Sequence, residues 1–482
     1  MRELKGVSAI AREVGDLWKK AAVPALMEYL RVPAISSAYD ADWEAGNSLQ
    51  DAAELLRRWC EGRPLAGLTT ELISQPGHPP ALVIDSPGDQ TFGEDEVILA
   101  YGHYDKQPAM EEWSKGLGPF SPVVRGERLY GRGAADDGWS IFGVMCALEA
   151  LERCAVPHRR VVAIMEGEEE SGSSGFEEYL GMLRDRAVEP RAVISLDSGG
   201  PTDDRLWMVT SLRGSIRFSL QVEVLVAPVH SGTGGGIVPS SFRVARALLS
   251  RMEDENTGQV MLRESSSAVP EERRREAEAL AEELSWVACG NFPVAEGITL
   301  GGNSPAERLL MQTWEPSLAV IGIDGIPPGS SAPAVLHKSV RVMVLMRTPP
   351  EADVTRIVEE IQEICQKSVP SNARAELEFH AVVPGWSAIG KRSWIDDALD
   401  SASREVFGRG AGRVGQGGTV PPVPILSAAF PDAEVVCFGV MGPDSNAHGP
   451  DESLLLSTAV GATVGLASLF RWRTAVEGGA VK

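Results

Sequence analysis

Three short apolar runs constrain the fold of this chain more than any other feature. They occupy residues 97–100, 161–165 and 192–196, and helical patterns such as that of residues 141–154 lie between them. Strands that are buried on both faces read as continuous apolar runs, and strands that alternate with helices usually pair in parallel. We therefore predict an α/β domain whose mostly parallel sheet is covered by helices on both faces.

The pattern changes after residue 211. Apolar and polar residues alternate over residues 218–226, which is the period of a strand with one solvated face. Similar strands follow at 340–346 and 375–379, and helical patterns occupy 240–252 and 351–367. These elements predict an antiparallel sheet with two helices on one face, which is an α+β domain of the ferredoxin-like kind.

The first pattern returns near the carboxyl end of the chain, with a predicted helix at 394–407 and a predicted strand at 435–440. The α+β domain is therefore expected to be an insertion into the α/β domain. A length of 482 residues also favours two domains. We expect one domain to comprise residues 1–211 and 384–482, and the inserted domain to comprise residues 212–383.

Composition and patterning exclude several kinds of partner. The formal net charge of −22 argues against nucleic acid, whose binding requires a basic surface. The first twenty residues lack the unbroken apolar core of an export signal, and the apolar segment 454–470 is interrupted by polar residues and short for a membrane span. The six cysteines are scattered and form no CxxC pair. We expect a cytoplasmic protein with reduced cysteines and no membrane partner.

Residues of metal-binding type follow each apolar run. Ligands collect at the carboxyl ends of the strands in an open parallel sheet. The stretch GHYDKQP follows the first run, EGEEESGS the second and SLDSGG the third, while GRGAADDG and NAHGPDE add two further groups. The candidate residues are His103, Asp105, Asp136, Asp137, Glu166, Glu168, Glu169, Glu170, Asp197 and His448.

The density of carboxylates in these motifs favours a metal site. Four glutamates within five residues repel one another in a water-poor crevice unless a cation is present. Imidazoles combined with carboxylates suit zinc, with manganese or cobalt as alternatives. One catalytic zinc uses about three protein ligands, so the larger set predicts two divalent ions per chain. Each motif alone also fits a turn, a solvated acidic loop or a surface histidine, and their joint occurrence after strands favours the metal interpretation.

Taken together, these motifs resemble the zinc metallopeptidases that include carnosinase, carboxypeptidase G, acetylornithine deacetylase and aminoacylase. The resemblance covers nearly the whole chain, including the inserted domain. It implies that His103 and Asp197 bind one metal ion, that Glu170 and His448 bind the other, and that Asp136 bridges both. It also implies that Glu169 is the general base and that Asp105 orients the ring of His103.

Three further motifs extend the resemblance, two of them in the inserted domain, for which it also implies a lid and dimerisation role. VHSGTGGG is similar to a family motif whose histidine reaches into the partner subunit's active site. In a homodimer, His230 is therefore expected to polarise the scissile carbonyl of a substrate that is bound by the other subunit. Arg347, in VLMRTPP, matches an arginine that grips the substrate carboxylate. GQGGTVP resembles a substrate loop usually written REGGSIP, and the expected substrate contacts are therefore Gly417, Gly418 and Thr419.

The chain also departs from the family pattern. Gly415 and Gln416 replace the arginine and glutamate of that substrate loop. Lys106 stands where an aliphatic residue is common, and Gly138 stands where a lysine is usual. None of these positions is a proposed metal ligand.

The resemblance implies a two-metal hydrolase of the dipeptidase or carboxypeptidase type. GHYD and an aspartate at position 197 are similar to the dipeptidase branch, whereas deacylases of the family tend to carry GHTD and a glutamate. An N-acyl amino acid deacylase is the first alternative, because it uses the same residues on a different acyl group. A metal-binding protein without turnover is the second alternative.

Overall fold

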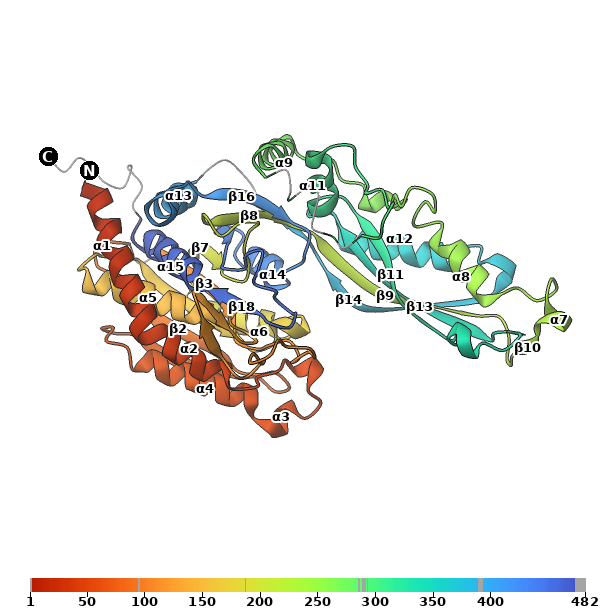
Figure 1. Cartoon of the computed structure of the whole chain (residues 1–482), viewed down its shortest axis with the longest axis horizontal. Helices are drawn as coiled ribbons and strands as arrows, with labels where there is room; N and C mark the ends of the chain where they lie inside the picture. Colours follow the sequence, from red (N-terminus) through yellow and green to blue (C-terminus); the bar gives the residue numbers. More distant parts are fainter. Residues whose placement is uncertain are drawn as a thin grey trace. The chain divides into compact units, whose positions relative to one another are not determined.

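The computed structural model describes residues 2–472 except 94–95, 187, 285–286, 288–291, 293 and 389–392, and it divides into two compact units (Figure 1). Unit 1 comprises Met1–Thr210, Ala388–Val414 and Val420–Lys482. Unit 2 comprises Ser211–Ser387 together with the short segment Gly415–Thr419. That segment belongs to unit 2 although the chain on both sides of it belongs to unit 1.

Unit 1 is built on a sheet whose strands follow the order β1-β2-β6-β3-β7-β17-β8. The bounds are β1 Thr69–Ile73, β2 Ala81–Ser86, β3 Val97–His103, β6 Arg160–Glu166, β7 Pro190–Ser195, β8 Trp207–Leu212 and β17 Glu434–Cys437. The four central strands β6, β3, β7 and β17 are parallel, which confirms the predicted sheet. The flanking strands β2 and β8 pair antiparallel with their inner neighbours.

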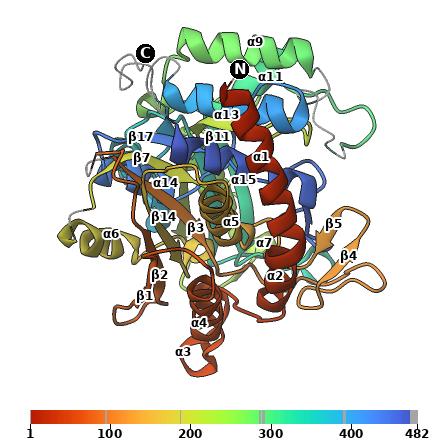
Figure 2. The ribbon, with the colours of Figure 1, turned by 90° about the vertical axis from the view of Figure 1, so that its left-hand side faces the viewer.

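Helices cover both faces of this sheet. Their bounds are α1 Arg2–Leu17, α2 Val23–Leu30, α3 Trp43–Gly46, α4 Ser48–Glu61, α5 Trp139–Arg153, α6 Phe176–Asp185, α13 Trp394–Phe407, α14 Pro422–Ala429 and α15 Leu456–Arg471. The larger core lies on one face, where α1, α5 and α15 pack side by side (Figure 2). A smaller core under α6 and α14 covers the other face. Because all of Val97–His103 is buried between these layers, β3 is apolar without interruption until its last residue.

The apolar segment near the carboxyl end forms α15, which is buried on almost every side. It is therefore a packed helix, as its polar interruptions predict. Among the described residues, no helix combines the length and the apolar character that crossing a bilayer requires. Five of the six cysteines are described and all five are free, and Cys289 lies outside the described residues.

Unit 2 contains the predicted antiparallel sheet, in the order β11-β13-β9-β14. The bounds of its main elements are β9 Gly214–Glu223, β10 Val229–His230, α7 Ser231–Gly234, α8 Ser241–Leu249, α9 Glu271–Glu283, α11 Pro305–Thr313, β11 Ser317–Asp324, β12 Val335–Leu336, β13 Ser339–Thr348, α12 Val354–Gln366 and β14 Arg374–Val383. Apolar residues of α8 and α12 pack on one face of the sheet. The edge strand β11 was not anticipated from the sequence.

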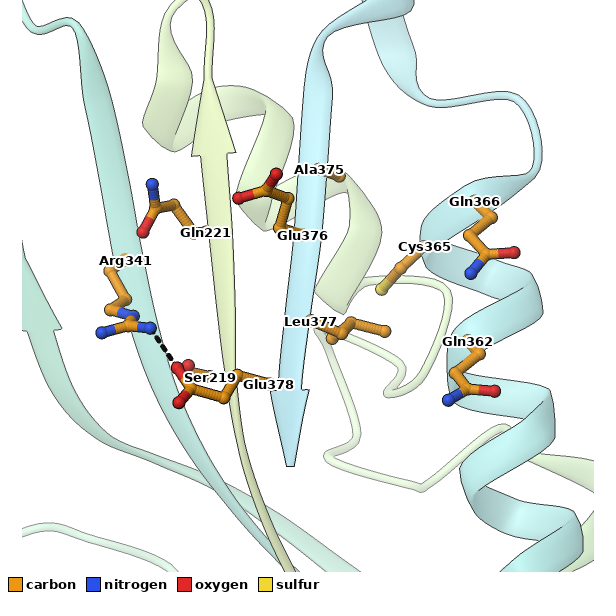
Figure 3. A pocket seen from close by; sticks show the side chains of 10 residues that line it. All are labelled: Ser219, Gln221, Arg341, Gln362, Cys365, Gln366, Ala375, Glu376, Leu377 and Glu378. Carbon is orange, nitrogen blue, oxygen red and sulfur yellow. Dashed lines mark hydrogen bonds and ion pairs between the residues drawn. The ribbon is translucent and has the colours of Figure 1, made fainter. Parts of the chain in front are cut away.

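The two edges of the unit 2 sheet differ in character. A polar groove of about 480 Å³ runs along β14, where Arg341 pairs with Glu378 (Figure 3) and Arg374 pairs with Glu376. The opposite edge strand, β11, exposes Val320, Ile321 and Ile323 to 45%, 50% and 46%. Charged side chains discourage strand addition at a sheet edge, whereas an apolar exposed edge permits it. The edge of unit 2 that suits pairing with another strand is therefore β11.

Lys106 is a fully buried lysine on the loop that follows β3. Its Nζ donates to the carbonyl oxygens of Tyr29 at 3.1 Å and Val32 at 2.7 Å, and it lies 4.0 Å from the centroid of the Tyr29 ring. These carbonyls stand at the C-terminal end of α2, where a positive charge is favourable. Burial nevertheless lowers the pKa of Lys106 to about 7.

The same tyrosine explains the second departure from the family pattern in this region. A Cβ at Gly138 would lie 2.5 Å from Cε1 of Tyr29 and 2.4 Å from the carbonyl oxygen of Gly133. A side chain at position 138 would therefore have to displace either the ring or the backbone. Lys106 and Gly138 are linked in space, because Lys106 contacts the ring that leaves no room at Gly138.

We expect replacement of Lys106 by methionine to change how stability depends on pH. Between the folded pKa of about 7 and the unfolded value of about 10.4, the unfolded chain binds a proton that the folded chain releases. The wild-type free energy of unfolding therefore gains up to about 1.4 kcal/mol per pH unit in this window from Lys106, and Lys106→Met loses that gain.

Denaturant unfolding of both proteins at pH 7, 8.5 and 10 measures the difference, which should grow in favour of the wild type as the pH rises. Lys115→Met, at an exposed lysine, is the matched control and should show no such trend. A difference between wild type and Lys106→Met that stays constant from pH 7 to 10 contradicts the expectation.

Candidate metal centre

Three segments carry candidate ligands at the carboxyl ends of the central strands of unit 1. β3 ends at His103. The neighbouring strand β6 is followed by a single 3₁₀ turn, Glu169–Ser171, which carries Glu169 and Glu170. Asp197 follows β7 on the other side of β3. Parallel pairing brings these strand ends to one edge of the sheet, as the sequence pattern predicts.

A small second sheet brings the two remaining segments together. Its strands are β4 Val123–Arg125, β5 Arg128–Tyr130 and β18 Ser453–Leu455, and Ser453 of β18 lies opposite Tyr130 of β5. The turn that contains Asp136 follows β5, and the turn that contains His448 precedes β18. The pairing therefore places these two turns next to each other.

Asp136 lies between two imidazole rings. Its Oδ1 is 3.1 Å from Nε2 of His103, and its Oδ2 is 2.9 Å from Nε2 of His448. The same Nε2 of His448 is 3.3 Å from Oε2 of Glu170, and Nε2 of His103 is 4.0 Å from Oδ2 of Asp197. One carboxylate thus faces both histidines, and each histidine faces a second carboxylate.

The five residues predicted as ligands all lie in this cluster. Two overlapping groups have ligand atoms within 4.8 Å of one another: His103, Asp136 and Glu170 form one, and His103, Glu169 and Asp197 form the other. Glu169, which the resemblance makes a general base, is therefore close enough to act as a ligand.

Burial gives the cluster unusual protonation behaviour. It raises the pKa of Glu170 to about 8 and that of Asp197 to about 6, and it raises the pKa of Glu169 well above its usual range. Burial also opposes ionisation of Asp136, but hydrogen bonds from His103 and His448 outweigh it and hold the pKa of Asp136 below its usual range. The hydrogen bond to Asp136 raises the pKa of His448 to about 9.

Burial is the first cause of the raised pKa values of Glu169, Glu170 and Asp197, and the charges of neighbouring carboxylates raise them further. A divalent cation would relieve their repulsion, and imidazole nitrogen with carboxylate oxygen is a donor set that zinc, manganese and cobalt accept. The residues therefore fit a metal centre. The two groups share His103, and Asp136 faces both histidines, so the cluster offers enough donors for more than one ion.

Asp105 connects the histidine to the turn that carries the glutamates. Its Oδ1 is 3.3 Å from Nδ1 of His103. Its two oxygens also accept hydrogen bonds from the backbone N–H groups of Glu169 at 3.2 Å and Glu170 at 3.0 Å. The arrangement suits the predicted orienting role, because a carboxylate on the second ring nitrogen sets which nitrogen is free to bind metal.

The other two glutamates of EGEEESGS point away from the cluster. Glu166 accepts hydrogen bonds from the hydroxyls of Tyr101 at 2.5 Å and Ser173 at 2.9 Å. Glu168 lies 2.8 Å from Nδ1 of His78. Only Glu169 and Glu170 of the acidic run therefore join the candidate metal ligands.

Two residues that organise the centre were missed from the sequence. Glu452 accepts hydrogen bonds from the backbone N–H groups of Gly133, Ala135 and Asp136, at 3.1 to 3.3 Å. It also forms a fully buried ion pair with Arg132, at 2.7 Å. Arg132 in turn donates to the carbonyl oxygen of Gly449, beside His448, at 2.9 Å.

This ion pair therefore ties the turn of Asp136 to the turn of His448. Both partners stand inside motifs that the sequence highlights, GRGAADDG and NAHGPDE. Arg132 and Glu452 carry opposite charges, and charged residues are rarely fully buried unless they are paired. Their pairing across 320 residues is visible only in the fold.

The predicted substrate residues lie in unit 2. Nη1 of Arg347 donates to Oγ1 of Thr419 at 2.8 Å, so Arg347 and the Gly415–Thr419 segment are in contact. His230 is exposed, and its Nδ1 accepts from the backbone N–H of Gly232 at 3.1 Å. It immediately precedes the short helix α7.

Comparison with known proteins assigns the family. Residues 99–471 match peptidase family M20/M25/M40. The chain belongs to this family. A cysteinylglycine-S-conjugate dipeptidase of Corynebacterium striatum is 27% identical over 382 residues, which are 76% of this chain and 78% of that protein. The prediction of a metal-dependent peptidase from the carnosinase-like family is thereby confirmed.

Solved structures agree with this family assignment at the level of the fold. The dipeptidase Dug1p from Saccharomyces cerevisiae superposes with a TM-score of 0.77 at 22% identity, over 96% of this chain and 98% of that one. The metallo-carboxypeptidase Sso-CP2 from Sulfolobus solfataricus gives a TM-score of 0.78 at 21% identity, over 94% and 99%. Family members with both kinds of activity therefore share this fold.

We expect Glu452→Gln to weaken metal binding, because it breaks the pair that joins the turns of Asp136 and His448. Removal of an outer partner of a metal site typically costs 10- to 100-fold in metal affinity. Chelator competition with zinc measures this loss.

Glu149→Gln is the matched control. It also breaks an ion pair of unit 1, between Glu149 and Arg63. The turn that contains Asp136 directly precedes α5, and Glu149 lies ten residues beyond the start of this helix, about 15 Å along it. It should lower stability and leave zinc affinity unchanged. Equal losses of zinc affinity in both variants would show that Glu452 acts only through general stability.

Proposed function

We propose that this protein is a dinuclear metal-dependent hydrolase that cleaves the amide bond of dipeptides or similar small peptides with a free carboxylate. The observation that carries the proposal is Asp136, whose two carboxylate oxygens face two different histidines beside Glu169 and Glu170. The names of the relatives support the substrate class: one is a cysteinylglycine-S-conjugate dipeptidase, and another, from Homo sapiens, is a Beta-Ala-His dipeptidase.

The ligand assignment follows the family resemblance. His103 and Asp197 would hold one ion, Glu170 and His448 would hold the other, and Asp136 would serve both. Zinc is the proposed metal, with manganese or cobalt as alternatives. Ions held there would supply Lewis acidity and lower the pKa of a water molecule towards about 7.

Glu169 is the proposed general base. It takes a proton from the attacking water and later delivers it to the leaving amine. Asp105 keeps the ring of His103 in place through Nδ1.

Arg347 is the proposed partner of the substrate's free carboxylate, with Gly417, Gly418 and Thr419 as further contacts. A guanidinium binds a carboxylate through two parallel hydrogen bonds, which gives both affinity and orientation. The contact between Arg347 and Thr419 supports a shared role for these residues.

Glu169→Gln tests the reaction and the role of Glu169 at once. We expect the variant to keep its metal content and to lose about 10²- to 10⁴-fold in kcat on a dipeptide, because the proton acceptor is gone. Elemental analysis and a dipeptide-library assay with zinc, manganese and cobalt give the two readouts.

Glu168→Gln is the matched control, because its side chain faces His78 rather than the cluster, and most of its activity should remain. Loss of metal from Glu169→Gln would make Glu169 a ligand instead of the base. A wild type that cleaves N-acetyl amino acids but no dipeptide would replace the proposal with the deacylase alternative.

We also propose a cytoplasmic homodimer whose active sites are shared. The exposed apolar edge strand β11 supports pairing with a second copy. Val226 and Ile237, which flank His230 in sequence, are 94% and 83% exposed. Such apolar exposure suits contact with another subunit, where His230 would polarise the scissile carbonyl. The five described free cysteines suit a reducing compartment.

Mixed dimers test the sharing of sites. Glu169→Gln and His230→Ala, each confirmed inactive alone, are unfolded and refolded together. In a two-fold dimer one site of each mixed pair would carry both defects and the other neither. With random assortment about half the dimers are mixed, so roughly a quarter of wild-type activity should return. If no activity returns although mixed dimers form, His230 does not serve the partner's site.

A further inference from the structure

Arg213 is a buried arginine of unit 2 that lies between β8 and β9, outside the motifs that carry the predicted site residues. Its Nε donates to the carbonyl oxygen of Gly417 at 3.1 Å. Its Nη1 donates to the carbonyl oxygen of Glu315 at 3.0 Å and lies 3.4 Å from that of Met311, both near the C-terminal end of α11. The guanidinium therefore joins the glycine-rich segment to a helix end, where a cation is favourable.

The backbone of Arg213 holds the same segment at a second point. Oγ1 of Thr419 donates to the carbonyl oxygen of Arg213 at 2.6 Å. Because that hydrogen bond uses the hydroxyl proton, the oxygen of Thr419 is left to accept from Nη1 of Arg347 at 2.8 Å. A chain of two hydrogen bonds thus runs from Arg213 through Thr419 to Arg347.

The segment fits closely against this support. A Cβ at Gly417 would lie 2.5 Å from the carbonyl oxygen of Gln312 and 3.2 Å from Nη2 of Arg213. Position 417 therefore has no room for a side chain while Arg213 and the end of α11 stay in place. This contact explains why Gly415–Thr419 belongs to unit 2.

Positive charge gathers at the same place. Within the described part of the chain, neither Arg213 nor Arg347 forms an ion pair with a carboxylate, and both donate to neutral oxygens. Burial, followed by the charge of Arg347, lowers the pKa of Arg213 to about 10, and burial also lowers the pKa of Arg347. Both side chains remain charged at neutral pH, so an anion bound beside them would relieve their repulsion.

We propose that Arg213 is a positioning residue of a carboxylate-binding site: it holds Gly415–Thr419 so that Thr419 orients Arg347 towards the anion. The inference rests on the proposed function in one respect, which is that the anion is the free carboxylate of the peptide substrate. It adds to that function a residue that determines specificity for free-carboxylate substrates without contacting them.

Kinetics on a dipeptide and on its C-terminal amide test the inference. Arg213→Met should raise KM for the free dipeptide by about 10-fold or more, with kcat changed less than about threefold, and should leave the amide nearly unaffected. The loss follows because a charge-assisted contact is impaired only where a carboxylate is present. Arg347→Ala should show the same split, and the double variant should be no worse than Arg347→Ala, because residues of one chain of contacts are not additive.

Two further variants separate positioning from charge. Arg213→Lys keeps the charge but cannot bond Gly417 and Glu315 through one planar fork, so it should behave like Arg213→Met. Arg217→Met, at an exposed arginine four residues further along the chain in β9, is the matched control and should match the wild type. Full rescue by lysine would overturn the inference, since charge alone would then suffice. Equal losses for dipeptide and amide would also overturn it.

Hydrogen exchange gives a readout that does not depend on turnover. The backbone N–H groups of residues 415–419 should exchange faster in Arg213→Met and Arg213→Lys than in the wild type, and at the wild-type rate in Arg217→Met. Unchanged exchange in both Arg213 variants overturns the positioning role even if the wild type cleaves dipeptides. Faster exchange in a protein that hydrolyses no dipeptide would instead refute the proposed function and the carboxylate assignment, while the hold of Arg213 on the segment would stand.

Discussion

The structure of unit 1 depends on keeping several carboxyl groups buried at one edge of a parallel sheet. Asp136, Glu169, Glu170 and Asp197 meet there with only two imidazoles among them. Burial of an ionised carboxylate is costly unless a charge or a hydrogen bond compensates it. The local pKa values record this tension, since Glu170 and Asp197 titrate above their usual range while Asp136, between the histidines, titrates below it.

Neighbouring residues hold the turns that carry these carboxyl groups in place through hydrogen bonds and an ion pair. Asp105 accepts from the backbone of the turn that carries Glu169 and Glu170. Glu452 accepts from the backbone that carries Asp136, and Arg132 balances its charge. These supports place ligand atoms within reach of one another before a cation arrives, which reduces the reorganisation that binding requires.

Unit 2 differs from unit 1 in the charge of its candidate site, which contains the positively charged side chains of Arg213 and Arg347. Arg347 is held by Thr419, and Thr419 is held by Arg213. The sheet of this unit has one charged edge and one apolar edge, and β11 is the edge that suits pairing with another strand.

The sequence by itself determined the central strands, the motifs that follow them along the chain and the residues of the carboxylate cluster. It could do so because the central buried strands are continuous apolar runs, and His103, Glu169, Glu170 and Asp197 follow such runs within a few residues. Asp136 and His448 stand in separate motifs, and the pairing of β5 with β18 brings these together. Only the tertiary structure decided the pairing of Arg132 with Glu452, the hold of Arg213 on Gly417 and Thr419, and the place of Gly415–Thr419 in unit 2. These contacts join residues that are 204 to 320 positions apart, and no local period or spacing encodes which distant partners meet. The fold also made Lys106 compatible with burial, by placing it against carbonyls at the end of α2 that its own sequence neighbourhood does not contain.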